Sequence, residues 1–384
     1  MSRIVWAGIG PWHKTGYGLG TALFPGRFRD LGHQVVIAVF GEKTGPQHPM
    51  NHPDAAETKR TGVWDGMRVI GPGPAEFALP RREQIQAAFG GRDPDLVIVL
   101  KDAWILRAQD YARYRAAVWL AADTTPLGVP DRQFFAAAPG VRPVCVARHG
   151  LALARQAGLS EPLYVPFGID MAQWTPGGRQ AARDLLGLPQ DVLIAGIDGQ
   201  NIGPRKGWGE QFAAFAGFHA KHPKSLLLVH ATPDHPDGVN LRQLAAHLGI
   251  PVLFGSHGNM TQAQMLTWYR SLNVLLQGTL GEGFGVPITQ AHALGIPVIG
   301  TDCSAITEKI PPGTGWLVRG QRWWNPHHQA WWTIPNVAGL TAALGKAYRG
   351  QHASPAVIRE HALAYDADNV TKTYWVPALE ELTA

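Results

Sequence analysis

The stretch of sequence that decides the fold is GEGFGVPITQAHALGIPVIGTD, residues 281–302. Its glycine-rich turn runs into an apolar helical pattern, with Pro287 near the first helical position. Gly295 stands where a left-handed C-terminal cap is expected, and a β-branched run at 298–301 follows it. A turn, a helix, a cap and a strand in this order are typical of a parallel sheet whose strands are connected through helices.

The same alternation extends along the whole chain. Short apolar runs are separated by longer helical patterns, which predicts an α/β protein with two doubly wound, Rossmann-like parallel-sheet domains that face each other across a cleft. The predicted strands are 4–7, 35–40, 96–100, 118–121, 144–146 and 163–165 in the first half, and 192–196, 226–230, 252–254, 274–277, 298–301 and 316–318 in the second. Helices are predicted at 211–221, 241–248, 262–271 and 355–382.

The junction between the two domains is predicted at 166–178, where Pro and Gly interrupt every periodic pattern. The predicted domains are residues 1–172 and 173–360. The last segment, 361–384, is predicted to be a helix that packs back toward the N-terminal domain. Because ligands of open parallel sheets bind at the carboxyl ends of the strands, we expect the functional site in the interdomain cleft.

Composition narrows the class of protein. The chain has 384 residues, of which 45% are hydrophobic and 16% charged, so each domain can form a full core. No apolar run reaches the ~18 residues of a membrane span, and the N-terminal residues form a strand pattern rather than a signal peptide. Two distant cysteines, Cys145 and Cys303, cannot build a disulfide framework, so a reduced, cytoplasmic protein is expected. A net charge of +5 without a run of basic residues is weak support for nucleic-acid binding.

The turn at 281–285 is the first candidate ligand site. Its glycines allow close backbone approach, and the N–H groups at the start of the following helix attract an anion. Glu282 and, eight positions later, Gln290 offer acceptors for hydroxyl groups. A ligand that carries both phosphate and sugar fits this combination. The alternative is a tight strand–helix turn in which the Glu is incidental.

The loop DGQNIGPRKG, residues 198–207, is the second candidate. It follows a predicted strand and opens a helix, and it places Arg205 and Lys206 side by side. Two adjacent cations near a helix N-terminus favour an anion, because their charges and the helix dipole add. The alternative is a pair of solvated loop cations.

The N-terminal domain offers weaker candidates. The loop GIGPWHKTGYGLG, residues 8–20, places Gly16 and Gly18 after the first strand, but it matches neither the dinucleotide fingerprint nor a phosphate-binding P-loop. It could equally be a turn without a ligand. Asp102 and Asp123 follow two predicted strands and would point into the cleft, although Asp at a strand end is often only a cap or turn former.

Tryptophan is concentrated at 316–335, which contains five of the fourteen Trp residues. These rings could stack on sugar rings or bases, or form a local packed cluster. The pairs His219 with His222 and His327 with His328 lack an evident third ligand, so no metal site is predicted.

The turn, the basic loop and the linker together resemble the signature of retaining glycosyltransferases of family four, which have the GT-B fold. In that family a Glu before Gly-Phe-Gly is followed eight positions later by a second Glu; here these positions are Glu282 and Gln290. Residues 166–176, PFGIDMAQWTP, are similar to the family's Asn-Gly-Val-Asp linker, with Phe167 where Asn is usual. Residues 198–207 are similar to its loop ending in Arg-Lys-Gly.

The resemblance implies transfer of a hexose, with glucose from a UDP-sugar as the first expectation, to a hydroxyl group with retention of configuration. It makes 1–172 the acceptor-side domain and 173–360 the nucleotide-sugar domain. Arg205 and Lys206 would bind the donor diphosphate, and Glu282 the sugar hydroxyls. Gln290 would bind the ribose more weakly than the usual Glu, because it lacks a charge. The backbone N–H groups of the turn would support sugar or phosphate at Gly283, Phe284 and Gly285.

The resemblance is less detailed in the N-terminal domain. The loop with Gly16 and Gly18 would approach the diphosphate from that side, and Asp102 occupies the neighbourhood where the family often has a His, so it is assigned a catalytic role. The implied mechanism is a same-face attack that needs neither a metal nor a cofactor. Departing diphosphate would be stabilised by the two cations and by helix N-termini.

The acceptor stays open at this point. The compact N-terminal domain, the pI near 9.2 and the Trp-rich segment resemble glycosyltransferases of some bacteriophages, which adds a modified DNA base or a virion protein to ordinary glycans as acceptors. An alternative is a nucleotide-sugar or nucleic-acid binding protein without catalysis. A third possibility is phosphorolysis or hydrolysis in a similar cleft.

Overall fold

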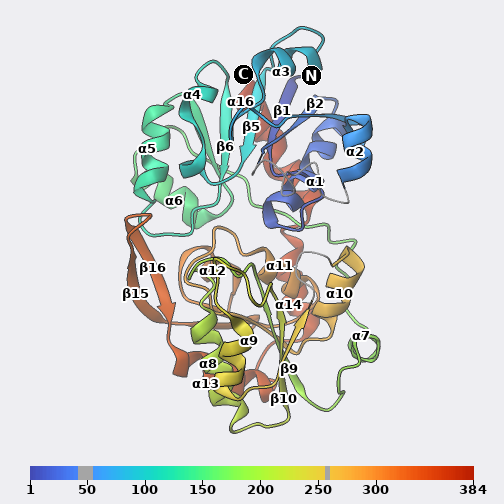
Figure 1. The fold of residues 1–384 in the computed structure, drawn as a ribbon, viewed down its shortest axis with the longest axis vertical. Helices are drawn as coiled ribbons and strands as arrows, with labels where there is room; N and C mark the ends of the chain where they lie inside the picture. Colours follow the sequence, from blue (N-terminus) through green and yellow to red (C-terminus); the bar gives the residue numbers. More distant parts are fainter. Residues whose placement is uncertain (42–54, 256–259) are drawn as a thin grey trace. The chain divides into compact units, whose positions relative to one another are not determined.

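The computed structural model describes residues 1–41, 55–255 and 260–384, and the chain divides into two compact units (Figure 1). The first unit comprises Met1–Ala122, Pro126–Gly168 and Ala367–Ala384. The second comprises Asp123–Thr125 and Ile169–Asp366.

The first unit is built on one sheet, which has eight strands among the described residues. Its strands are parallel except for the antiparallel pair β3–β4 at one edge. In sheet order they are β3 (Val63–Trp64), β4 (Met67–Ile70), β2 (Gln34–Val39), β1 (Arg3–Gly8), β5 (Leu96–Leu100), β6 (Ala116–Leu120), β7 (Val141–Cys145) and β8 (Leu163–Tyr164). The central strands are buried along their whole length, as expected for a parallel sheet covered on both faces.

Helices cover this sheet, and the C-terminal segment contributes to them. The helices that precede Gly168 are α1 (Gly16–Asp30), α2 (Ala56–Thr61), α3 (Arg82–Ala88), α4 (Ala108–Tyr111), α5 (Val129–Ala137) and α6 (Arg148–Gln156). The C-terminal segment adds α15 (Ala367–Val370), a π-helical turn (Thr371–Trp375) and α16 (Val376–Thr383). Trp375 in that segment is fully buried, and its ring lies 5.0 Å from Trp119 and 5.1 Å from Phe28, measured between centroids.

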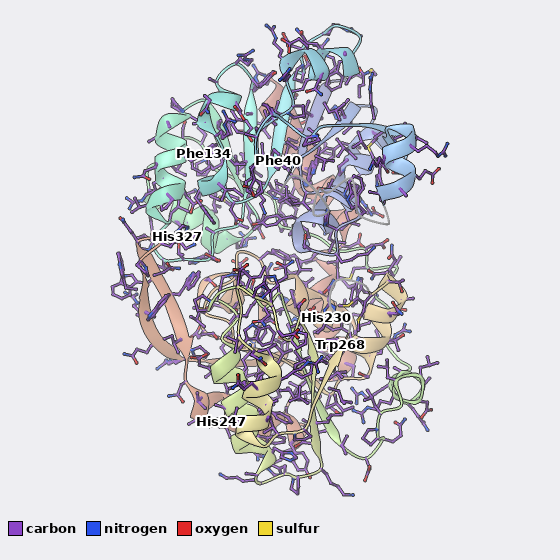
Figure 2. The ribbon with its side chains drawn as sticks, in the orientation of Figure 1. Phe40, Phe134, His230, His247, Trp268 and His327 are labelled. Carbon is purple, nitrogen blue, oxygen red and sulfur yellow. The ribbon has the colours of Figure 1, made fainter. Side chains whose placement is uncertain are left out.

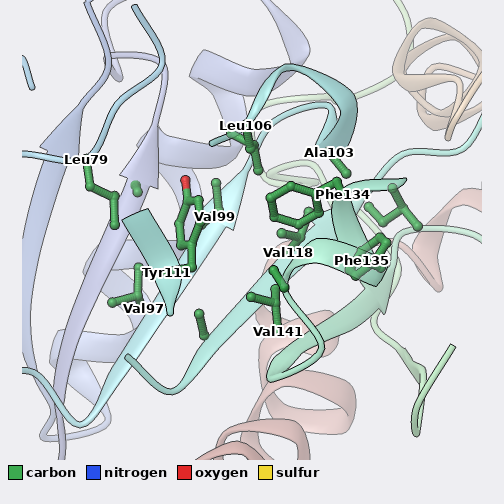
Figure 3. Close-up of a cluster of buried hydrophobic side chains, with 14 of the residues drawn as sticks. Leu79, Val97, Val99, Ala103, Leu106, Tyr111, Val118, Phe134, Phe135 and Val141 are labelled. Carbon is green, nitrogen blue, oxygen red and sulfur yellow. The ribbon is translucent and has the colours of Figure 1, made fainter. Parts of the chain in front are cut away.

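A large apolar cluster lies between the sheet and the helices of the first unit (Figure 3). Strand residues such as Val99 and Val118 meet Phe134 and Phe135 of α5 there. Burial raises the pKa of Tyr111, which lies in the same cluster, well above its ordinary value, so its hydroxyl stays neutral.

The second unit has a six-stranded, wholly parallel sheet within the described residues. In sheet order its strands are β11 (Val252–Gly255), β10 (Ser225–His230), β9 (Leu193–Asp198), β12 (Val274–Gln277), β13 (Val298–Thr301) and β14 (Gly315–Val318). Its helices are α7 (Arg179–Leu186), α8 (Trp208–His219), α9 (Leu241–Leu248), α10 (Gln262–Arg270), α11 (Val286–Ala293), α12 (Ser304–Lys309), α13 (Val337–Tyr348) and α14 (Pro355–Leu363). Each of the twelve strands predicted from the sequence overlaps an observed strand, so the predicted fold class is confirmed.

The Trp-rich segment forms an antiparallel hairpin of β15 (Gly320–Asn325) and β16 (Ala330–Pro335). Sequence analysis did not predict these strands, because adjacent Trp pairs on each strand hide the alternation of a half-buried strand. Directly opposed residues of the hairpin share a face, so Trp323 and Trp332 lie on one face and Trp324 and Trp331 on the other.

The predicted helix at 355–382 is interrupted, because the chain leaves the second unit within it. Apart from the short segment Asp123–Thr125, the chain passes between units after Gly168 and again after Asp366. Just inside the second unit, the Ile169 N–H donates to the Tyr365 carbonyl at 3.0 Å, and Ile169 forms a parallel bridge with Asp366. Both crossing points are therefore joined by backbone pairing.

Candidate active site

Three charged side chains from two loops of the second unit meet in one cluster. Arg205 and Lys206 lie on the loop between β9 and α8, and Glu282 lies on the turn between β12 and α11. Because β9 and β12 are neighbours in the parallel sheet, the loops that follow them lie side by side. The structure thus brings together the two segments that the sequence singled out as candidate anion sites.

The contacts within this cluster are short. The Lys206 Nζ donates to Glu282 Oε1 at 2.6 Å, and the Arg205 Nη1 donates to Glu282 Oε2 at 3.0 Å. The Arg205 Nη1 also donates to the Gly281 carbonyl at 2.9 Å. Lys206 and Glu282 are buried, whereas the Arg205 side chain keeps 32% of its surface exposed. Arg205 is therefore the member of this group that a ligand can reach most easily.

Burial and pairing act in opposite directions on the charges. Burial opposes ionisation of Glu282, but the Lys206 ammonium and the Arg205 guanidinium outweigh it and lower the pKa of the carboxyl to about 2. Burial lowers the pKa of Lys206, and the Glu282 carboxylate offsets only part of this effect. Glu282 is consequently ionised at neutral pH and needs the two cations to remain so.

Asp123 adds a second carboxylate to the cluster. Its Oδ2 lies 3.5 Å from the Arg205 Nε, and 23% of its side chain is exposed. Arg205 is thereby held between two carboxylates in the absence of ligand. A diphosphate that binds this guanidinium would have to replace part of these contacts.

The two loops are also tied to each other by uncharged groups. The Leu280 N–H donates to the Arg205 carbonyl at 2.8 Å. The fully buried amide of Gln211 donates to the Lys206 carbonyl at 2.6 Å and accepts from the Gly278 N–H at 3.0 Å. A Cβ atom at Gly281 would lie 2.2 Å from the Asp123 carbonyl oxygen, so only glycine permits this approach. The charges are thus presented by a fixed backbone.

Helix α12 supports the turn from its other side. The Glu282 N–H donates to Ser304 Oγ at 2.9 Å, and the Ala305 N–H donates to the Glu282 carbonyl at 3.3 Å. Gln277 at the end of β12 donates its side-chain amide to Glu282 Oε1 at 3.4 Å. The backbone and the carboxylate of Glu282 are therefore both held in place.

A buried lysine packs against the aromatic ring of the turn. The Lys309 Nζ lies 3.6 Å from the ring centroid of Phe284 and 3.6 Å from that of Tyr365. It also lies 3.8 Å from a carboxylate oxygen of Glu308, and its side chain is only 1% exposed. Cation–π attraction is strongest in such a desolvated position, so Lys309 holds the Phe284 ring in place.

The remaining predicted residues of the second unit lie on the same turn and helix. Gly283 and Gly285 flank Phe284, and Gly285 is the N-cap of α11, which has Pro287 in its first turn. Gln290 lies in the middle of α11 and is half-buried. The role of Gln290 toward ribose stays a prediction.

A hydrogen-bonded network centred on Asp198 lies at the ends of β9 and β10. Asp198 accepts from the Tyr269 hydroxyl at 2.5 Å, and its other oxygen lies 2.8 Å from His230 Nδ1. The His230 ring lies 6.0 Å from that of Trp268 (Figure 2). Burial disfavours the Asp198 carboxylate, but His230 and Tyr269 outweigh it and the carboxyl pKa is lowered. This network lies at the start of the loop that carries Arg205 and Lys206, because Asp198 is the last residue of β9.

The predicted residues of the first unit form a separate cluster at the ends of β1 and β5. Asp102 Oδ1 accepts from the Tyr17 hydroxyl at 2.5 Å, and the Lys101 Nζ lies 4.6 Å from the Tyr17 ring centroid. Gly16 and Gly18 form the first turn of α1, and a Cβ atom at Gly18 would lie 2.1 Å from the His13 carbonyl oxygen. The structure therefore places Asp102 beside this glycine-rich turn.

Three residues around the turn were not assigned a role from the sequence. Asp123 was noted only as an acidic strand end, while Ser304 and Lys309 were not noted at all. Their partners lie far away along the chain, and nothing in the local pattern around them signals the contact.

The described part of the chain lacks two kinds of feature. Within it, no cluster of three or more His, Cys, Asp or Glu side chains has the arrangement of a metal site. None of the helices in 1–41, 55–255 and 260–384 is long and apolar enough to cross a membrane.

Solved structures with the same architecture define the fold as GT-B. A glycosyltransferase from Rickettsia africae is similar with a TM-score of 0.71 and 12% identity, over 99% of this chain and 98% of that chain. The Anabaena protein HepE, solved in complex with UDP and glucose, is similar with a TM-score of 0.75 and 14% identity, over 99% and 100% of the two chains.

Sequence comparison adds a family over part of the chain. Residues 201–324, which include the basic loop and the turn, match the family described as Glycosyl transferases group 1. A D-inositol 3-phosphate glycosyltransferase of Streptomyces avermitilis is 33% identical over 164 residues, which are 40% of this chain and 35% of that protein. The chain thus spans about a third of the length of this curated relative.

Proposed function

We propose that the protein is a retaining glycosyltransferase that moves a hexose from a nucleoside-diphosphate sugar to a hydroxyl acceptor. The observation that carries this proposal is the buried cluster of Arg205, Lys206 and Glu282, which combines anion-binding and hydroxyl-binding groups. The match of 201–324 to Glycosyl transferases group 1 supports it, and so does the similarity to a fold solved with UDP and glucose.

In this proposal the two cations bind the donor diphosphate. Arg205 turns from Asp123 and Glu282 toward the phosphate oxygens, and Lys206 supplies a fixed positive charge behind it. Glu282 then accepts hydrogen bonds from the hydroxyls of the transferred sugar. The N–H groups of Gly283, Phe284 and Gly285 add dipoles at the start of α11. We further propose that the second unit, with 173–360, binds the donor and that 1–172 lies on the acceptor side.

The proposed reaction proceeds on one face of the sugar. The bond between the anomeric carbon and the diphosphate oxygen breaks, and the acceptor oxygen forms its bond to the anomeric carbon from the same side. The acceptor proton passes to an oxygen of the leaving diphosphate. Charge that develops on this group is stabilised by Arg205 and Lys206, an effect for which a single donor typically contributes ~10²–10³ in rate. The step is balanced without a further co-reactant.

Gln290 stands where the family that the sequence resembles has its second Glu. Its carbonyl oxygen accepts a ribose hydroxyl without a charge, so we expect weaker nucleoside binding than a carboxylate gives. Replacement of Gln290 by Glu is expected to lower the Kd for the nucleoside diphosphate about tenfold, since a charged acceptor strengthens a hydrogen bond by ~1.4 kcal/mol or more.

A thermal-shift panel of UDP-, GDP- and ADP-sugars tests the donor. A ligand at 100 times its Kd adds ~2.7 kcal/mol to the free energy of unfolding, so one of the three is expected to raise the Tm. If none does, the proposed function is wrong. The Arg205→Ala variant should lose the shift while keeping the Tm of the unliganded protein within a few degrees.

A donor-binding protein without catalysis is the second candidate, and Gln290 at the proposed ribose position favours it. Chromatography of released nucleoside diphosphate separates the two functions. A transferase releases it in the presence of an acceptor, whereas a binding protein shows the thermal shift and no release.

A further inference from the structure

The second strand of the β15–β16 hairpin contacts the proposed active site. The Thr333 N–H of β16 donates to the Leu280 carbonyl at 2.9 Å, immediately before the Glu282 turn. The neighbouring segment 123–125 pairs with the same strand, because the N–H and carbonyl of Thr125 bond to Trp331 at 3.0 and 2.9 Å. Strand β16 is thus hydrogen-bonded both to the residue before the turn and to the segment that carries Asp123.

One face of the hairpin continues the charged cluster. The Trp332 Nε1 donates to Asp123 Oδ1 at 3.4 Å, while the other oxygen of Asp123 lies 3.5 Å from Arg205. Trp323, which is half-buried, stacks on Trp332 with centroids 5.8 Å apart and an interplanar angle of 25°. Arg205, Asp123, Trp332 and Trp323 therefore form a row that leads away from the proposed diphosphate site.

The opposite face has a different character. It carries Trp324 and Trp331, which are 45% and 36% exposed and meet edge to face at 4.9 Å. Arg322, opposed to Thr333, lies on this face as well. Trp323 and Trp324 lie on opposite faces of the same strand, so the two faces can be tested separately.

We infer that the Asp123–Trp332–Trp323 row is an acceptor subsite contributed by the second unit, in addition to the acceptor side proposed for 1–172, and that it binds a saccharide ring. This inference rests on the proposed function, because it makes the row the neighbour of the donor. Trp332 is buried and supports the half-buried Trp323 ring, which offers a flat apolar surface for the C–H face of a sugar. The partly exposed Asp123 carboxylate accepts hydrogen bonds from the sugar hydroxyls. The same carboxylate positions Arg205, so acceptor and donor share one residue.

The charges of the row favour a saccharide over a nucleic acid. A single-stranded nucleic acid needs a basic groove that follows its phosphates, in addition to stacking rings. On the row, Asp123 is negative and the only cation is Arg205, which the donor diphosphate occupies. Arg322 points to the other face of the hairpin. A neutral polyhydroxylated ligand meets no repulsion there.

Saturation-transfer NMR with methyl α-glucoside, methyl α-mannoside, maltose and cellobiose tests the inference, with the oligonucleotide dT12 as the competing ligand. At least one saccharide is expected to bind the wild-type protein. Trp323→Ala and Asp123→Asn should weaken its binding tenfold or more. Trp324→Ala removes an equally large ring from the opposite face of the same hairpin and should leave binding within twofold of the wild type.

The inference is overturned if no saccharide binds, if dT12 binds in their place, or if Trp324→Ala weakens binding as much as Trp323→Ala. All binding is measured on the unliganded protein and again with UDP. A protein that shows no thermal shift with any nucleotide sugar fails the proposed function, whether or not the row binds saccharide. If a nucleotide sugar raises the Tm but the row binds no saccharide, only this inference is wrong.

Discussion

The two units each collect a lysine and an acid at the ends of parallel strands, and they do so by different means. In the second unit the Lys206 ammonium contacts the Glu282 carboxylate directly at 2.6 Å, and both are buried. In the first unit the Lys101 ammonium lies against the rings of Tyr17 and Phe77, at 4.6 and 5.3 Å, and Tyr17 donates to Asp102. Tyr17, Phe77 and Lys101 are half-buried, and so is Asp102 itself.

This difference predicts how each cluster responds to change. A buried ion pair is expensive to break, because the remaining charge has no water to solvate it. A half-buried polar group held by an aromatic ring can exchange its partner for water. We therefore expect large and coupled effects in the second unit and small, separable effects in the first.

Lys206→Met should give the largest effect. It leaves Glu282 buried beside Arg205 alone, and breaking such a pair destabilises a protein by ~3–5 kcal/mol. Transfer should also fall by ~10²–10³, as for other lost electrostatic donors. Denaturant unfolding and steady-state kinetics measure the two losses. The matched control is Lys224→Met, which removes an exposed pair with Asp191 at 2.8 Å and should leave the stability nearly unchanged, because water screens such a pair. Equal losses in the two variants would contradict the comparison.

Acid titration should expose the pairing of Glu282. Its carboxyl pKa is lowered from 4.5 to about 2, so between these values the unfolded chain binds a proton that the native protein does not. The stability contributed by this group is present above pH 4.5 and is lost as the pH falls toward 2, by about 3 kcal/mol in total.

The test of this titration is the pH dependence of unfolding, measured from pH 5 to pH 2.5. The wild type should lose more stability over this range than Glu282→Gln. The exposed control Glu57→Gln should follow the wild type. Parallel curves for wild type and Glu282→Gln would show that the carboxylate is not held by the two cations.

Lys309→Met should have an intermediate effect on the same unit. The variant keeps the length of the side chain but removes the cation between Phe284 and Tyr365, an interaction worth ~2 kcal/mol when desolvated. The turn that carries Glu282 should become more mobile, with a tenfold or greater rise in amide exchange over 281–285 and a similar rise in the Kd for donor. Lys309→Arg should restore part of both. A general loss of protection across the unit, without a larger change at the turn, would argue against this role.

Asp102→Asn should have the smallest effect. An Asn oxygen still accepts from Tyr17, so the free energy of unfolding should change by less than ~1 kcal/mol. Because Asp102 is predicted to act catalytically on the acceptor side, kcat/KM for the acceptor should fall severalfold and the Kd for donor should not change. A loss of stability and transfer as large as that of Lys206→Met would show that the two clusters do not differ in their response to mutation.

The fold and the charged cluster of the second unit were predictable from local pattern. The length of the apolar runs and their β-branched residues indicate the strands. Loops that follow neighbouring parallel strands lie side by side, and this brings Arg205 and Lys206 to Glu282. The hairpin was not predictable, because two adjacent Trp residues on each strand point to both faces. The role of Lys309 was not predictable either, because a lysine at a helix end is normally solvated and its aromatic partners are distant in sequence.

The burial of Trp375 has a consequence for synthesis. This ring fills the interior of the first unit against Trp6 and Trp119, yet it leaves the ribosome after the whole of the second unit. The second unit can therefore complete its fold on the nascent chain, while the first unit stays unfinished until residues 367–384 emerge. Translation that stops at residue 366 should yield a protein whose later half is native and whose earlier half is a target for proteases.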